Sequence, residues 1–162
     1  MRERLVTPLH RAALTTFGRL PAPARWAVVR RTTPTFSVGA LLVAVRGAEV
    51  LLLRQRHHAG WTLPGGLLSR GETPRGALRR ELGEELGLHD LPLPEHPTVV
   101  AFHPAERHID AIFVVDLAGA PELRLVPDLT EVLEAGWIRL DDPTLPSLTI
   151  DVLSRVPGLV AG

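Results

Sequence analysis

Four glutamates gather in one short stretch of this 162-residue chain. Glu81, Glu84 and Glu85 fall within a single helical turn and a half, and Glu72 precedes them in a glycine-rich segment. Carboxylates three or four residues apart are neighbours on a helix, and each like-charged pair costs roughly 0.2–0.5 kcal/mol. A sequence that keeps them together usually has a cation to bind. Hard oxygen donors beside a flexible loop suit Mg²⁺ or Mn²⁺ with a phosphate sharing the metal.

The helix that would carry these carboxylates is predicted between two capping signals. Thr73 suits the N-cap and Pro74 the first helical position, whereas Gly87 suits the position after the last turn. An apolar stripe follows the helical period at Ala77, Leu78, Leu82 and Leu86. The glutamates are therefore expected on the side of the helix away from this stripe.

The surrounding elements predict an α/β fold, an α/β/α sandwich with a mixed central sheet. Apolar runs and turn residues predict strands over 36–45, 50–53, 61–63, 98–102, 109–117 and 134–140. Helical periodicity predicts further helices over 5–19 and about 148–156. Residues 24–35 are interpreted as a linker or an edge strand.

Composition excludes several classes of protein. The length favours one domain, and 45% of the residues are apolar, which is enough for a packed core. The chain has no cysteine, so disulfides, thiolate catalysis and cysteine-based metal sites are excluded. No apolar run approaches the ~18 residues of a membrane-spanning helix. A cytoplasmic location is expected, with no membrane as a partner.

Charge separates the amino-terminal segment from the rest. Residues 1–35 hold seven arginines and one acidic residue, Glu3. This basic arm is interpreted as a short helix docked on the domain or on a second subunit; a transit peptide and a contact with RNA or an anionic substrate are the alternatives. The expected boundaries are the arm at 1–35, a domain at 36–156 and a tail at 157–162.

The glutamate pattern resembles the signature of the Nudix hydrolase family, GX5EX7REUXEEXGU, where U is aliphatic. The segment reads Gly66-x5-Glu72-x7-Arg80-Glu81-Leu82-x-Glu84-Glu85-x-Gly87-Leu88. Every fixed position is met, and the likeness extends over roughly residues 36–156.

This resemblance implies a role for each position of the signature. Glu81, Glu84 and Glu85 would bind divalent ions, and Glu81 and Glu84 are also candidates for catalysis. Glu72 would support them, and Arg80 would pair with Glu72 or with a helix glutamate and orient it. Two further metal-site candidates are the Gly66 carbonyl, left free by a tight backbone turn, and a later glutamate. For the latter, Glu131 is preferred to Glu134.

Four residues are candidates for binding the substrate. Arg54 and Arg56 leave the second strand near the loop, and arginine forks suit phosphate. Arg107 lies in a stretch similar to that of the MutT branch, where the arginine contacts the nucleotide; an exposed strand arginine is the alternative. Trp61 is a candidate for stacking on a base, with burial beneath the loop as the alternative.

The activity implied by the resemblance is hydrolysis of a nucleoside diphosphate linked to a group X. Water would attack a phosphorus of the pyrophosphate, with Mg²⁺ or Mn²⁺ as the cofactor. A nucleoside triphosphate or a nucleotide sugar is the favoured substrate. The alternatives are a non-catalytic nucleotide-sensing module, an ADP-ribose pyrophosphatase and an RNA pyrophosphohydrolase, although nucleic acid is not the favoured partner. A homodimer is considered because members of the family are often dimers.

Overall fold

A computed structural model describes residues 8–159, and its contacts divide the chain into two compact units between Thr35 and Phe36. The first unit contains two helices, α1 (Pro8–Arg19) and α2 (Ala22–Thr32). The prediction of a linker or edge strand after residue 23 was therefore wrong. Pro21 and Pro23 begin α2 rather than excluding a helix, because the first turn of a helix needs no backbone N–H partner.

The second unit is built on a seven-stranded sheet with the order β3-β2-β1-β6-β5. Strand β4 pairs with β1, and β7 pairs with β2. Only the β1–β6 pair is parallel, so the sheet is mixed, as predicted. The strands are β1 (Ser37–Arg46), β2 (Glu49–Gln55), β3 (Trp61–Thr62), β4 (Gly65–Leu67), β5 (Val99–His103), β6 (His108–Asp116) and β7 (Val132–Arg139).

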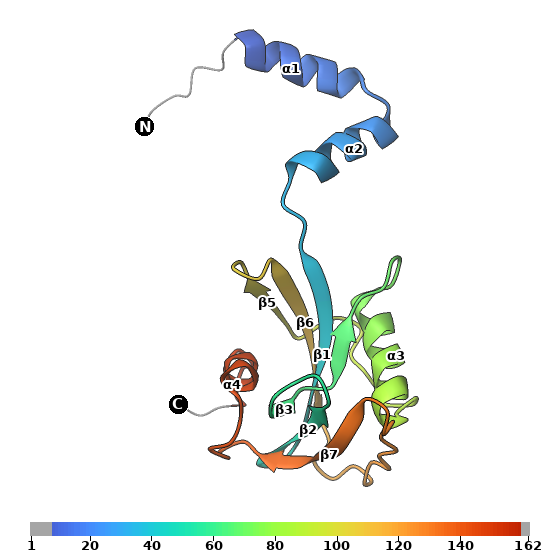
Figure 1. Cartoon of the computed structure of the whole chain (residues 1–162), viewed down its shortest axis with the longest axis vertical. Helices are drawn as coiled ribbons and strands as arrows, with labels where there is room; N and C mark the ends of the chain where they lie inside the picture. The colour runs from blue at the N-terminus through green and yellow to red at the C-terminus, as the bar shows by residue number, and fades with distance from the viewer. Residues whose placement is uncertain (1–7, 160–162) are drawn as a thin grey trace. The chain divides into compact units, whose positions relative to one another are not determined.

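Helices cover the two faces of this sheet, as Figure 1 shows for α3 (Pro74–Leu86) and α4 (Ser147–Ser154). Alternate residues of β1 enter separate cores, because side chains along a strand point to opposite faces. Leu42 packs in the core that contains α3, and Val43 packs in the core that contains α4. The predicted α/β/α sandwich is confirmed. Within residues 8–159, no helix has both the length and the apolar character needed to cross a bilayer.

The termini of α3 follow the predicted capping signals. The Thr73 hydroxyl accepts a hydrogen bond from the Gly76 N–H at 3.1 Å. Gly87 adopts a left-handed conformation with φ 66°, and its N–H donates to the Gly83 carbonyl. These caps place the glutamates at defined positions on the helix.

The glycine-rich segment before α3 contains β4, a short strand that local periodicity did not predict. Gly65 has a φ of 130°, and a Cβ at this position would overlap the Ala40 carbonyl oxygen. Glycine is therefore required for β4 to pair with β1. This pairing brings Gly66 beside α3.

Candidate active site

Glu85 is the buried centre of the candidate site. Its side chain lies between α3 and the sheet, and the residue is only 3% exposed. The expectation that the glutamates lie away from the apolar stripe was therefore wrong for Glu85, which is buried with Leu78 and Leu82. The Gly65 N–H donates to Glu85 Oε2 at 2.9 Å, and Gln55 Nε2 donates to Oε1 at 2.5 Å. Burial raises the pKa of Glu85 to about 7 despite the Gly65 hydrogen bond, and the negative charges of Glu81 and Glu131 also raise it.

Glu81 lies against the backbone of Gly66. A Cβ at residue 66 would be 2.5 Å from Glu81 Oε1, so only glycine leaves room for this carboxylate. Gly66 pairs with Ala40 on β1, which holds its backbone in place. The Glu81 carboxylate of α3 therefore lies directly against the backbone of β4.

Arg80 binds the carboxylates on the more exposed side of the site. Its guanidinium donates to Glu81 Oε1 at 2.8 Å and to Glu84 Oε2 at 3.1 Å. It also donates to the Leu67 carbonyl at 3.2 Å, which ties α3 to β4. One arginine thus orients two helix carboxylates and the glycine-rich segment.

Glu72 forms a two-pronged ion pair with Arg80. Arg80 Nε lies 2.9 Å from Glu72 Oε1, and Nη2 lies 3.1 Å from Oε2. The Ser69 N–H donates to the same carboxylate at 2.7 Å. The Arg80 hydrogen bond, followed by that of Ser69, lowers the pKa of Glu72 to about 2. The expected pairing of Glu72 with Arg80 is therefore present.

The loop before β7 brings Glu131 within electrostatic range of Glu85. Arg56 positions this loop: its backbone N–H donates to the Glu131 carbonyl at 3.2 Å, and its guanidinium donates to the carbonyls of Leu129 and Thr130. Glu134 instead pairs with Arg54 at 3.4 Å. The geometry therefore favours Glu131 over Glu134 as a further member of the site.

The chemistry of this group fits a hard divalent cation. The candidate donors are all oxygen: the carboxylates of Glu81, Glu85 and Glu131 and the Gly66 carbonyl. Glu85 is a buried carboxylate whose charged neighbours, Glu81 and Glu131, both disfavour its ionisation, and a cation would reverse that effect. In residues 8–159, no three acidic or histidine side chains already stand in ligating positions. Arg80, Gln55 and the Gly65 N–H occupy the carboxylate oxygens instead.

Comparison with known families matches residues 33–155 to the NUDIX domain, which is most of the chain. The chain belongs to the NUDIX family. The crystal structure of a MutT NUDIX hydrolase from Burkholderia pseudomallei shares 25% identity with it at a TM-score of 0.60, covering 74% of this chain and 97% of that one. The resemblance inferred from the glutamate signature is confirmed.

Curated relatives of this NUDIX domain carry the names of pyrophosphate hydrolases. The RNA pyrophosphohydrolase of Psychrobacter cryohalolentis is 42% identical over 65 residues, which cover 40% of this chain and 35% of that protein. A Mycobacterium tuberculosis protein, provisionally named 8-oxo-dGTP diphosphatase 2, is 56% identical over 48 residues, which cover 27% of this chain and 34% of that protein. These alignments span about a third of the length of each relative. The names support the expected enzyme class.

The proposed substrate residues of the NUDIX domain do not form one cluster. The guanidinium carbon of Arg54 lies 5.9 Å from the centre of the Trp61 ring, and the same guanidinium pairs with Glu134. Trp61 is half-buried, and its carbonyl accepts a hydrogen bond from Thr149 on α4. The guanidinium of Arg56 bonds loop carbonyls rather than facing open space. Their roles toward substrate stay predictions.

Arg107 lies in the turn between β5 and β6 rather than on the strand, which corrects its expected position. It adopts a positive φ of 53°, and its carbonyl accepts a hydrogen bond from the Ser37 N–H. Next to it, His108 Nε2 lies 2.8 Å from the buried carboxylate of Asp110. Arg107 thus stands beside a polar cluster at the start of β6, and its nucleotide contact stays a prediction.

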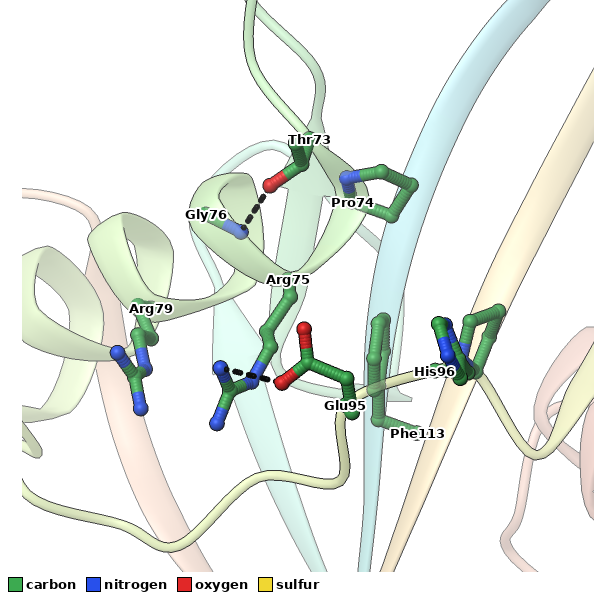
Figure 2. A pocket seen from close by; sticks show the side chains of 9 residues that line it. Thr73, Pro74, Arg75, Gly76, Arg79, Glu95, His96 and Phe113 are labelled. Atoms are coloured by element: carbon green, nitrogen blue, oxygen red, sulfur yellow. Dashed lines mark hydrogen bonds and ion pairs between the residues drawn. The ribbon is translucent and has the colours of Figure 1, made fainter.

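A cavity of about 400 Å³ lies at the N-terminal end of α3 (Figure 2). Arg75 projects into it and pairs with Glu95 at 3.1 Å. The helix period puts Arg75 and Arg79 on a different face from Arg80. None of the α3 glutamates belongs to the described lining of this cavity, so it is separate from the carboxylate site.

Gln55 is the member of the site that sequence reasoning missed. It is a buried polar residue at the end of β2, and its side-chain amide donates a hydrogen bond to Glu85. The available signal was strand alternation, which places Gln55 on the same face as Leu51 and Leu53. Its partner lies 30 residues away, so no local pattern identified the contact.

Proposed function

We propose that this NUDIX protein is a divalent-metal-dependent pyrophosphohydrolase. It hydrolyses a nucleoside diphosphate linked to a further group, and a nucleoside triphosphate or nucleotide sugar is the favoured substrate. The observation that carries the proposal is the burial of Glu85 beside the like-charged Glu81 and Glu131. A buried carboxylate with two like-charged neighbours is costly to ionise, and a bound cation would remove that cost.

Gly66, Glu81, Glu85 and Glu131 would hold the metal, and Glu84 would join directly or through water. The bound metal would neutralise charge on phosphate oxygens and lower the pKa of a water molecule. The protein residues supply geometry: Gln55 and the Gly65 N–H orient Glu85, and Arg80 orients Glu81 and Glu84.

A glutamate would accept the proton from the attacking water, a role typically worth about 10²–10⁴-fold in rate. Glu84 suits this role because its side chain is 60% exposed and water can reach it. Its ion pair with Arg80 keeps it in one orientation. Glu81 is the second candidate, and Glu72 acts by positioning Arg80.

Arginines near the site would bind the rest of the substrate. Arg54 can release its exposed pair with Glu134 to meet a phosphate, since exposed ion pairs contribute at most about 1 kcal/mol. Arg107 and Trp61 would contact the nucleoside. Arg56 would act chiefly by holding the loop that carries Glu131.

A product-resolved screen tests the proposed activity. Canonical and oxidised nucleoside triphosphates, nucleotide sugars, ADP-ribose, dinucleoside polyphosphates and NADH are incubated with Mg²⁺ or Mn²⁺, and mass spectrometry in ¹⁸O-water identifies the attacked phosphorus. We expect turnover that EDTA abolishes and that Glu85→Gln lowers by at least about a hundredfold. Undiminished turnover by Glu85→Gln would contradict its role at the metal.

RNA 5′ ends are the second candidate substrate, favoured by the relatives named RNA pyrophosphohydrolase. A 5′-triphosphorylated oligonucleotide belongs in the same screen. A kcat/KM for this RNA well above that for any free nucleotide would replace the favoured substrate with RNA. Nucleotide binding without hydrolysis of any compound would instead support a non-catalytic sensor.

A further inference from the structure

The α1–α2 unit exposes cations and apolar side chains together. Four arginines lie between residues 12 and 35, Arg19, Arg25, Arg30 and Arg31, with no acidic residue among them. In the described part of the chain, none of their side chains forms an ion pair or hydrogen bond. No residue of α2 is buried. The unit therefore carries uncompensated positive charge.

Large apolar side chains of the same unit face solvent. Trp26 is 64% exposed, Leu14 57% and Val28 41%. On α1, Leu14 and Phe17 share one face while Arg19 lies opposite Phe17. On α2, Trp26 and Arg30 are neighbours four residues apart. Exposed apolar and cationic groups thus both occur around the two helices, with Val28 on the side of α2 opposite Trp26, and nothing in the described part of the unit buries them.

We propose that the α1–α2 unit binds the surface of an anionic lipid bilayer. Arginines are attracted to acidic headgroups, tryptophan favours the headgroup level, and aliphatic side chains enter the boundary with the acyl chains. The helices have 12 and 11 residues, about 18 Å each, so they lie in the interface rather than crossing a hydrocarbon core of about 30 Å.

Charge and exposed aliphatic groups favour lipid over the other anionic partners. RNA would engage the arginines and could stack on Trp26, but it offers no apolar layer for Leu14 or Val28. Residues 36–162 hold seventeen acidic residues and eleven arginines, so an anionic surface repels them. The attraction is therefore confined to residues 1–35, which include α1 and α2. This revises the expectation of no membrane partner, which rested on the lack of a spanning segment.

Co-sedimentation of the full chain with lipid vesicles tests the proposal without using its enzymatic activity. Vesicles of phosphatidylcholine alone are compared with vesicles containing phosphatidylglycerol. We expect binding only to the anionic vesicles, loss of binding when the salt is raised severalfold, and a blue shift of tryptophan emission that Trp26→Phe removes. Equal binding to both kinds of vesicle, or to neither, would overturn the proposal.

Two triple variants of equal charge change locate the binding surface. Arg25→Gln/Arg30→Gln/Arg31→Gln alters α2, and we expect about a hundredfold weaker partitioning. Arg124→Gln/Arg139→Gln/Arg155→Gln alters exposed positions of the second unit and should leave partitioning nearly unchanged, or weaken it slightly because the second unit becomes more acidic. Circular dichroism confirms that each variant is folded.

Other outcomes identify a different partner. Equal partitioning of the two triple variants would show that α2 is not the lipid surface. Lipid binding would be refuted if the full chain does not bind vesicles. The same holds if the α2 arginines are needed instead for RNA binding, measured by gel retardation, or for self-association.

Discussion

Gln55 on β2 donates a hydrogen bond to Glu85 on α3, with 2.5 Å between Nε2 and Oε1. The bond joins the end of a sheet strand to the helix of acidic residues and holds a buried carboxylate in one orientation. Thr62 supports the amide from the other side, because its hydroxyl donates to Gln55 Oε1 at 3.3 Å. The position of Glu85 therefore depends on the sheet as much as on its own helix.

Replacing Gln55 by Leu should move the pH dependence of activity. The Gln55 hydrogen bond lowers the pKa of Glu85, so its loss should raise that pKa and shift the acidic limb of the kcat/KM profile upward. A shift of one pH unit would cost about tenfold in rate on that limb. Thr144→Val is the control: it removes a hydroxyl that bonds Asp142 outside the carboxylate site, and it should leave the profile nearly unchanged. A Gln55→Leu profile identical to that of the wild type would contradict this role.

Gly66→Ala should abolish most activity while the protein still folds. The added Cβ would be 2.5 Å from Glu81 Oε1, so the carboxylate would have to leave its place. We expect at least a hundredfold loss of kcat, since small displacements of catalytic groups have effects of about this size. Gly136→Ala is the control, because its Cβ would meet only the Trp61 ring at 3.9 Å. Steady-state kinetics and circular dichroism provide the comparison.

Glu85 should make stability depend on pH in metal-free buffer. Its pKa is raised from 4.5 to about 7, so the folded state binds the proton more tightly than the unfolded state does. Stability is therefore full below pH 4.5 and falls as the pH rises through 7. Glu85→Gln should exceed the wild type above pH 8, by on the order of 3 kcal/mol.

Urea unfolding at pH 5 and pH 8.5, with EDTA or with Mn²⁺, measures this effect. Mn²⁺ should restore the stability of the wild type at pH 8.5 and leave Glu85→Gln almost unaffected. Equal stabilisation of both proteins by Mn²⁺ would argue against Glu85 as a ligand.

Glu72 should have the opposite pH dependence. Arg80 lowers its pKa from 4.5 to about 2, so its contribution is present above pH 4.5 and is lost as the pH falls toward 2. Glu72→Gln should therefore weaken the protein at neutral pH and flatten its acid unfolding curve. Circular dichroism between pH 7 and pH 2 monitors the transition, and a curve as steep as that of the wild type would disprove the coupling.

Glu131 and Glu134 should differ in their effect on the metal. Glu131 acts electrostatically on Glu85, whereas Glu134 pairs with the exposed Arg54. We expect Glu131→Gln to raise the Mg²⁺ concentration needed for half-maximal activity by roughly tenfold or more. Glu134→Gln removes the same charge three residues away and should have little effect. Magnesium titrations of activity distinguish the two variants. A larger increase in the required Mg²⁺ concentration for Glu134→Gln than for Glu131→Gln would assign the metal ligand to Glu134 instead.

The helix that carries the glutamates could be predicted because its signals are local. Thr73 and Pro74 begin α3, Gly87 ends it, and the apolar stripe lies within the same segment. All the signature glutamates lie in one helix and the loop before it, so their spacing can be interpreted without knowing the rest of the fold. Most strands were also predicted, because long apolar runs bounded by turns have few alternatives.

The helix α2 and the strand β4 were missed for different physical reasons. Pro21 and Pro23 suggested a break, yet proline is well tolerated in a first helical turn. Gly65 and Gly66 suggested a loop, and only pairing with β1 makes their segment a strand. Glycine has little strand preference of its own, so this element depends on its partner.

By itself, the sequence determined the family, the glutamate-bearing helix and the mixed α/β character, because capping, periodicity and spacing act over a few residues. Only the tertiary structure decided that Gln55 meets Glu85, that Gly66 faces Glu81 and that Glu131 lies near them while Glu134 pairs with Arg54. These contacts join separate elements through strand pairing and burial. Their formation depends on the packing of the whole sheet, which no local pattern encodes.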